Sequence, residues 1–239
     1  MGALFTYNQK TVLSLDFDRQ STCYQFCDYC YVDNMEKLYP SYLNKIEKNT
    51  EKVNNKPLQM ADRLNEEYVK YRLSRSKKFS RLDKVPVRIY GSGDYIPIHF
   101  KVLKKLNFKY FIISKNLTQK NMGLEIGKIL SLPKLTTLVL SFDNQNMNTY
   151  NNVKHLYKRD KIKFAFTGLA DDFQEWKKDY PFDIFFNISK KKLERAKSLL
   201  HKEQCPCDSG KMQLQKSCTY CSKCWRSSST KGREWNVIN

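Results

Sequence analysis

The sequence predicts an α/β protein built on parallel β-strands. Short apolar runs rich in Val, Ile, Leu, Phe and Tyr recur along the chain, and segments with helical periodicity lie between them. A strand followed by a helix, repeated in this way, is typical of parallel strands joined by right-handed crossovers. Periodicity alone allows an open doubly wound sheet or a partial (β/α)6 barrel. In both folds ligands bind at the carboxyl ends of the strands.

The expected elements alternate through most of the chain. Strands are expected at residues 12–17, 87–90, 110–114, 136–142, 162–167 and 183–188. Helices are expected at residues 58–75, 98–106, 121–132, 145–157, 171–178 and 190–201. Residues 45–56 are strongly polar, which indicates a surface loop. Because the helical pattern ends near residue 201, we expect a main domain over residues 1–202 and a small Cys-rich extension over residues 203–239.

The chain carries a strong positive charge. Its 239 residues include 43 Lys and Arg against 24 Asp and Glu, a net charge of +19, with the excess concentrated in residues 37–84 and 190–239. Two interpretations remain open: solvated helix faces, or a surface that attracts a nucleic acid or another polyanion. A charge so far from neutral opposes non-specific self-association, so we expect a monomer.

The sequence gives no sign of a membrane or secretory segment. No stretch approaches the roughly 20 apolar residues that span a bilayer, and the N-terminal residues lack the pattern of a signal peptide. The cysteines form two clusters and do not suggest a disulfide framework. We therefore expect a cytoplasmic protein without membrane association, in which clustered thiols bind metal.

The first cysteine cluster comprises Cys23, Cys27 and Cys30, directly after the first expected strand. Three thiolates on one short loop can converge on one metal centre, and thiolate is the soft ligand that iron–sulfur clusters and zinc prefer. Three ligands would leave one iron of a four-iron cluster open. The alternatives are a structural zinc site with a distant fourth ligand, or three buried thiols.

This C-x3-C-x2-C loop, with the aromatic Tyr29 before its last cysteine, resembles the radical S-adenosylmethionine (SAM) superfamily. The resemblance implies that the three cysteines hold a [4Fe-4S] cluster whose fourth iron binds the SAM amino and carboxylate groups. An external one-electron donor would then drive SAM cleavage to methionine and a 5′-deoxyadenosyl radical, which abstracts hydrogen from a substrate. It also implies a partial (β/α)6 TIM-type barrel, in preference to the doubly wound sheet.

The loop after the second expected strand contains Gly91, Ser92, Gly93 and Asp94. It resembles the superfamily's Gly-Gly-Glu motif, which contacts the SAM ammonium, although Ser92 intervenes and Asp replaces Glu. Two glycines let a backbone approach a ligand closely. The alternative is a tight turn in which Asp94 caps a helix.

Polar residues also end the later strands. The resemblance implies roles for them toward the carboxylate, ribose and adenine of SAM: Lys115 could pair with a carboxylate, whereas Ser141 and Asp143 could bind hydroxyls. Thr167 and Gly168 loosely resemble the superfamily's adenine motif. The full set of strand-end candidates is Ser114, Lys115, Ser141, Asp143, Thr167, Gly168 and Asn187. Each could equally be an ordinary polar residue at a strand end.

The second cysteine cluster comprises Cys205, Cys207, Cys218, Cys221 and Cys224. Two readings compete: an auxiliary [4Fe-4S] cluster, favoured by the C-x2-C-x2-C run from Cys218 to Cys224, or a zinc ribbon using the first four cysteines. Either metal would help to fold this extension.

The layout most resembles the phage "gene product 88" family. The shared features are the three-Cys loop, Arg-x-x-x-Ser-Gly-Asp at residues 88–94, Ser-Lys at 114–115 and the closing C-x2-C-W at 221–225. If the protein is phage-encoded, the host cytoplasm is its expected location. Three functions stay open: a radical SAM enzyme acting on a nucleic acid or nucleotide, one acting on a peptide or protein, and a non-catalytic zinc-containing nucleic-acid-binding module.

Overall fold

Strands β1 to β7 form one mostly parallel sheet in the computed structural model, which describes residues 4–6, 13–23, 27, 30, 32, 37–75, 86–188 and 203. The strands are β1 (Phe5–Thr6), β2 (Ser14–Leu15), β3 (Val87–Ile89), β4 (Tyr110–Ser114), β5 (Leu135–Phe142), β6 (Ile162–Gly168) and β7 (Ile184–Asn187). Among the described strands, β1 alone is antiparallel to its neighbour, and β2 to β7 are parallel. The expected α/β class with parallel strands is therefore confirmed.

The strands lie side by side in the order of the sequence, from β1 to β7. A doubly wound sheet reverses its strand order at a switch point, and the described strands contain no such reversal. When right-handed crossovers all move in one direction along a sheet, their helices fall on one face. The described strands therefore run across the sheet in one direction.

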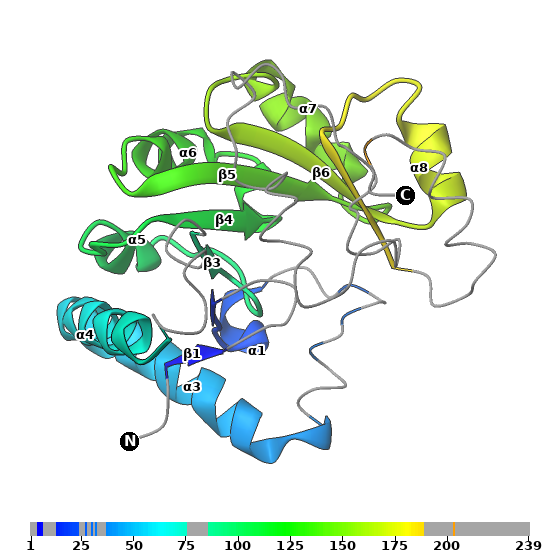
Figure 1. Ribbon diagram of the computed structural model, residues 1–239. Helices are drawn as coiled ribbons and strands as arrows, with labels where there is room; N and C mark the ends of the chain where they lie inside the picture. The colour runs from blue at the N-terminus through cyan, green and yellow to red at the C-terminus, as the bar shows by residue number, and fades with distance from the viewer. Residues whose placement is uncertain are drawn as a thin grey trace, which may run out of the picture.

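The helices of the described part of the chain are α1 (Arg19–Thr22), α3 (Pro40–Asn55), α4 (Pro57–Arg75), α5 (His99–Leu103), α6 (Gly123–Leu130), α7 (Tyr150–Val153) and α8 (Ala170–Trp176). Of these, α4 to α8 cover one face of this sheet. Figure 1 shows α4, α5, α6, α7 and α8 following one another around the outside of the sheet. The apolar residues that α4 to α8 bury join one core cluster with alternate strand residues such as Leu15, Ile89 and Leu138.

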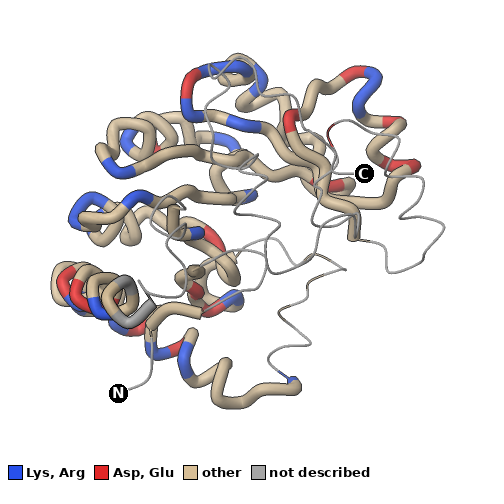
Figure 2. The backbone as a smooth tube through the Cα atoms, in the orientation of Figure 1, with Lys and Arg blue, Asp and Glu red and all other residues tan. Residues whose placement is uncertain are grey.

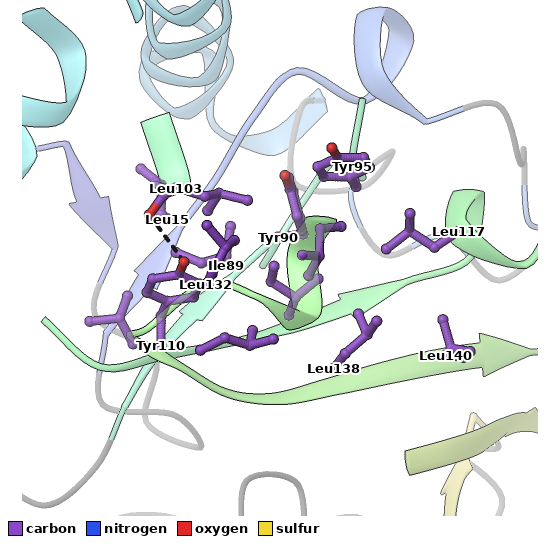
Figure 3. Close-up of a cluster of buried hydrophobic side chains, with 14 of the residues drawn as sticks. Leu15, Ile89, Tyr90, Tyr95, Leu103, Tyr110, Leu117, Leu132, Leu138 and Leu140 are labelled. Atoms are coloured by element: carbon purple, nitrogen blue, oxygen red, sulfur yellow. Dashed lines mark hydrogen bonds between the residues drawn. The ribbon is translucent and has the colours of Figure 1, made fainter. Parts of the chain in front are cut away.

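Figure 3 shows part of this core, in which leucines and tyrosines from β2 to β5 meet helix side chains. Tyr110 is fully buried, and its hydroxyl donates a hydrogen bond to the carbonyl oxygen of Leu103 at 3.0 Å. A buried hydroxyl needs such a partner. The bond also fixes the end of α5 against β4.

The other face of the sheet carries a smaller and mixed set of side chains. Val139, Ala165 and Ile184 form a second apolar cluster there, with Ile113 and Phe186 packed against it. Strand alternation puts Arg88 on this same face, because its neighbours Val87 and Ile89 are buried in the helix-side core.

The prediction of a surface loop at residues 45–56 was wrong. Residues 45–55 belong to the 16-residue helix α3, which buries Ile46, Asn49, Thr50 and Val53. Asn49 donates from Nδ2 to the carbonyl oxygens of Leu4 at 3.3 Å and of Asp16 at 3.1 Å. Asn49 and Thr50 are polar but buried, and both donate hydrogen bonds to backbone carbonyl oxygens. Their polarity is the reason that the sequence of this helix resembles that of an exposed loop.

The expected helix at residues 145–157 is broken into three short pieces. They are the 3-10 helix η3 (Met147–Thr149), α7, and the 3-10 helix η4 (Lys154–Leu156). The Thr149 hydroxyl donates to the carbonyl oxygen of Asn146 at 2.7 Å, the kind of side-chain bond that competes with regular helix. A third 3-10 helix, η2 (Asn116–Thr118), follows β4.

The expected helix at residues 190–201 and nearly all of the extension at 203–239 lie outside the described residues. Glu203 is described, and its carbonyl oxygen accepts the backbone N–H of Phe185 in β7 at 2.8 Å. No helix in the described part of the chain is long and apolar enough to cross a membrane.

Candidate functional site

The loops that follow β2, β3, β4 and β5 meet at the carboxyl ends of these strands, and Asp94 joins two of them. The Asp94 carboxylate accepts backbone N–H groups of Tyr95 at 2.6 Å, Lys115 at 2.9 Å and Asn116 at 3.1 Å. Asp94 is 4% exposed. Burial raises the pKa of this carboxyl, while hydrogen bonds from the Ser114 side chain and these backbone groups oppose the rise. Asp94 therefore fastens the loop after β4 to the end of β3, but it is not the helix cap of the alternative, because neither α5 nor η2 begins with a side-chain cap hydrogen bond.

The Gly91–Gly93 loop fits tightly against the end of β2. A Cβ at Gly91 would lie 2.0 Å from Ser14 Oγ and 2.1 Å from Asp16 Oδ1. The Ser92 N–H donates to Asp16 Oδ1 at 3.0 Å, and its hydroxyl donates to the carbonyl oxygen of Phe17 at 3.1 Å. Ser92, which interrupts the glycine pair, thus ties the loop to β2.

Gly93 has a φ of +71°, in the left-handed region that glycine adopts without steric cost. A Cβ there would lie 2.5 Å from Thr22 Oγ1 and 3.0 Å from the Phe17 carbonyl oxygen. The tight turn expected at this motif is therefore present, and it needs a glycine for both conformation and space.

Thr22 and Asn116 fix the start of the cysteine loop. Thr22 Oγ1 accepts the N–H of Asp94 at 3.0 Å and donates to the carbonyl oxygen of Asp18 at 2.6 Å. Asn116 Nδ2 donates to the carbonyl oxygens of Thr22 at 2.7 Å and Tyr95 at 3.0 Å. Because Cys23 follows Thr22 directly, the cysteine loop begins at the junction of three strand ends.

Lys115 brings together three of the residues singled out in the sequence. Its Nζ donates to Cys27 Sγ at 2.7 Å and forms an ion pair with the Asp143 carboxylate. The Lys115 side chain is 11% exposed and that of Asp143 is 2% exposed. Asp143 Oδ1 also accepts the N–H groups of Gln145 at 3.1 Å and Asn146 at 3.2 Å. Residues from the loops after β2, β4 and β5 thus meet at one ammonium group.

The three cysteines of the loop are half-buried and are not joined to one another by a disulfide. The N–H of Cys30 donates to the carbonyl oxygen of Cys27 at 2.9 Å, so these two lie on one tight turn. Within the described residues no three His, Cys, Asp or Glu side chains are gathered as metal ligands would be. The donor chemistry still fits an iron–sulfur cluster, because it offers three thiols on one loop beside a cation. Metal-binding side chains generally come together only when the metal binds.

The remaining strand-end candidates occupy separate places. Ser141 is buried near the end of β5, and its carbonyl oxygen accepts Asn146 Nδ2 at 3.1 Å. Thr167 and Gly168 end β6, two strands away from β4, and Gly168 pairs in register with Asn187 of β7. Ser114 Oγ accepts the N–H of Leu117 at 3.1 Å, so its position supports the turn after β4.

Several predicted site residues lie outside the part of the chain that the structure describes. They are Tyr29, Cys205, Cys207, Cys218, Cys221 and Cys224. Both metal options for the extension therefore stay predictions.

Three buried polar residues of this site were not singled out from the sequence: Asp16, Asn116 and Asn146. Each lies at or just beyond a strand end and hydrogen-bonds to the backbone of a neighbouring loop or turn. Asp16 was hidden inside the expected strand at residues 12–17, and Asn116 is one residue further from its strand than Lys115. Asn146 offered no signal, because it lay inside an expected helix.

No family model matches this sequence, and no curated protein or solved structure matches it either.

Proposed function

We propose that this protein is a radical SAM enzyme in which Cys23, Cys27 and Cys30 hold a [4Fe-4S] cluster. The contact between Lys115 and Cys27 carries the proposal, because it puts Cys27 at the carboxyl ends of parallel strands. This is where α/β proteins built on parallel strands bind their ligands. When bound, the cluster supplies one electron from an external donor to the SAM sulfonium, and methionine and a 5′-deoxyadenosyl radical result.

The chain's own residues provide binding and orientation at this place. Lys115 offers a cation that is held between Asp143 and Cys27. We assign it to the carboxylate of SAM, since an ammonium held in a partly buried setting pairs strongly with an anion. We assign the SAM ammonium to the Gly91–Gly93 loop, which is anchored to the end of β2 because the Ser92 N–H donates to Asp16 and the Ser92 carbonyl oxygen accepts the Phe17 N–H at 3.2 Å. The Asp94 carboxylate supports that loop from within.

We further propose that the sheet is a partial (β/α)6 TIM-type barrel. The consecutive order of β2 to β7 and the placement of α4 to α8 against one face support this arrangement. In such a barrel the face opposite the helices is the interior. The mixed apolar and polar face around Val139 and Ala165 would then line the space below the cysteine loop.

The proposal is tested by SAM cleavage after anaerobic reconstitution with iron and sulfide. Wild-type protein supplied with dithionite and SAM should release 5′-deoxyadenosine. The double variant Cys27→Ala/Cys30→Ala should release none, because two of three cluster ligands are lost. The variant Cys205→Ala/Cys207→Ala is the matched control, which should keep cleavage because the loop cluster does not use these residues.

Lys115→Gln should weaken SAM binding at least tenfold, as expected when a charge-assisted bond in a partly buried site is lost. Lys128→Gln is its control, because Lys128 forms a comparable ion pair with Glu125 at 2.7 Å but lies 44% exposed on α6. A zinc-loaded, colourless wild-type protein without cleavage would refute the enzyme and favour the zinc-containing nucleic-acid-binding module.

A further inference from the structure

Arg88 is a cation on the face of the sheet that the helices do not cover. It occupies the middle of β3, where Val87 and Ile89 point into the helix-side core. Strand alternation therefore directs Arg88 to the opposite face. Its register partners are Ser14 in β2 and Phe111 in β4, so it lies in the interior of the sheet and not at an edge.

The Arg88 side chain is half-buried, and its Nε lacks a hydrogen-bond partner among the described residues. Its Nε is fully shielded from solvent, and no hydrogen bond reaches it within the structure described here. Asp16 is the acidic neighbour along β2, but its Oδ1 accepts Ser14 Oγ at 3.2 Å and the Ser92 N–H at 3.0 Å. Leaving a buried guanidinium donor unsatisfied costs stability. Such a cost is expected where a ligand supplies the missing acceptor.

We propose that Arg88 binds an oxyanion, a carboxylate or a phosphate, of the substrate. The inference rests on the proposed function and names the chemical class of substrate for that site. A planar guanidinium matches both oxyanions in a bidentate manner. The same face carries the apolar cluster around Val139, Ala165 and Ile184, which lowers the local dielectric constant and strengthens the ion pair.

The position of Arg88 fits a ligand that extends toward the cysteine loop. Gly91 lies three residues further along the chain, and Lys115 lies four residues beyond Phe111, the register partner of Arg88. At about 3.3 Å per residue, these steps correspond to roughly 10 and 13 Å along the strands. A small molecule with an oxyanion at Arg88 can thus place a second part at the site of SAM cleavage.

The test is the thermal unfolding midpoint of the full-length chain, titrated with inorganic phosphate or with acetate at constant ionic strength in chloride. At ten times the dissociation constant, the bound anion should raise the midpoint by roughly 3–6 °C. The anion with the larger shift identifies the oxyanion as phosphate or carboxylate. Arg88→Met and Arg88→Gln should abolish the shift. Arg88→Met should not lower the midpoint without anion, because it removes a buried donor that lacks a partner.

Lys109→Gln is the control, because Lys109 is an exposed cation before β4; it should retain the wild-type shift. An unchanged anion shift in Arg88→Met, or no shift of the wild type with either anion, would overturn the assignment. The measurement does not depend on SAM cleavage. Anion binding lost with Arg88 in a protein that never cleaves SAM would leave Arg88 as an anion site and refute only the proposed chemistry.

Discussion

Two glycines of this chain have opposite surroundings. One position requires glycine for its backbone conformation and for space, and the other would accommodate a larger side chain. Gly93 has a positive φ, and a Cβ there would lie 2.5 Å from Thr22 Oγ1. Gly127 lies inside α6, where a Cβ would meet nothing within 4 Å. The same substitution should therefore have opposite consequences at the two positions.

We expect Gly93→Ala to lower the free energy of unfolding by about 2–4 kcal/mol, because alanine is strained at positive φ and meets Thr22. Gly127→Ala should raise it by about 0.5–1 kcal/mol, since alanine favours the helix. Urea unfolding of both variants measures the difference. Equal effects at the two positions would show that the Gly93 turn is not formed as described.

The sequence identified Lys115 and Asp143 as neighbours at adjoining strand ends, while their roles toward SAM stay predictions. Lys115 and Asp143 were expected to contact anionic or hydroxyl groups, and they pair with each other beside Cys27. For Asp94 the sequence left two alternatives open, a contact with the SAM ammonium or a structural role in a tight turn. A sequence does not reveal which backbone N–H groups a carboxylate will meet. Two of those groups belong to Lys115 and Asn116, just after β4, 21 and 22 residues further along the chain.

At the scale of elements, a histidine links the end of β3 to helix α5. The Tyr90 hydroxyl and His99 Nδ1 share a hydrogen bond of 2.9 Å, and the imidazole stacks on Phe17 with ring centroids 4.5 Å apart. Burial lowers the pKa of His99 to about 3. The ring of Tyr95 also faces this imidazole, and neither tyrosine ionises in acid. Burial between the end of β3 and α5 therefore keeps His99 neutral at physiological pH.

This buried histidine predicts an acid-sensitive stability. Between its unfolded pKa near 6.5 and its folded pKa of about 3, the unfolded chain binds a proton that the folded chain does not. The contribution of neutral His99 to the free energy of unfolding is complete above pH 6.5. It is lost as the pH falls through this window, by up to about 1.4 kcal/mol per pH unit.

Urea unfolding at pH 7.5 and 5.5 measures this effect, with His99→Asn as the comparison because it does not titrate. The wild type should lose about 1.4 kcal/mol more than the variant between the two pH values. Equal losses would show that His99 is not held neutral at this junction.

The sequence predicted the helices and strands most accurately where their apolar residues form a regular pattern. Strands β4 to β6 are long apolar runs, and the structure places them within a residue or so of the expected bounds. Strand β1 is two residues long and was missed. Helix α3 was mistaken for a loop because Asn49 and Thr50 occupy its buried face. In that helix buried hydrogen bonds replace apolar residues, and no hydrophobic pattern reveals them.

At the scale of the whole molecule, described cations gather at the amino ends of the strands. The exposed or half-exposed set before β4, β5 and β6 comprises Lys104, Lys105, Lys109, Lys134, Lys158, Arg159 and Lys161. Figure 2 shows Lys and Arg on these loops. The cysteine loop lies at the opposite, carboxyl ends. Any polyanion drawn to these cations would therefore contact a face remote from the proposed chemistry.

We expect single-stranded RNA to bind this face through its phosphates, with affinity that falls as salt rises. The triple variant Lys104→Gln/Lys105→Gln/Lys109→Gln should reduce the slope of log affinity against log salt by about 2. Lys48→Gln/Lys52→Gln/Lys56→Gln, on and just after α3, is the control with the same change in charge. Fluorescence anisotropy measures both; RNA binding that salt does not weaken would remove the polyanion from the account.

The proposed enzyme requires an iron–sulfur cluster in the three-Cys loop with one iron open to SAM. The most direct test is electron paramagnetic resonance of the dithionite-reduced, reconstituted protein with and without SAM, in a variant lacking Cys205 and Cys207 so that the loop cluster dominates the spectrum. The account predicts a [4Fe-4S]+ signal that changes its g-values when SAM is added and disappears in Cys27→Ala/Cys30→Ala. A cluster signal that SAM leaves unchanged, or no cluster at all in the loop, would contradict it.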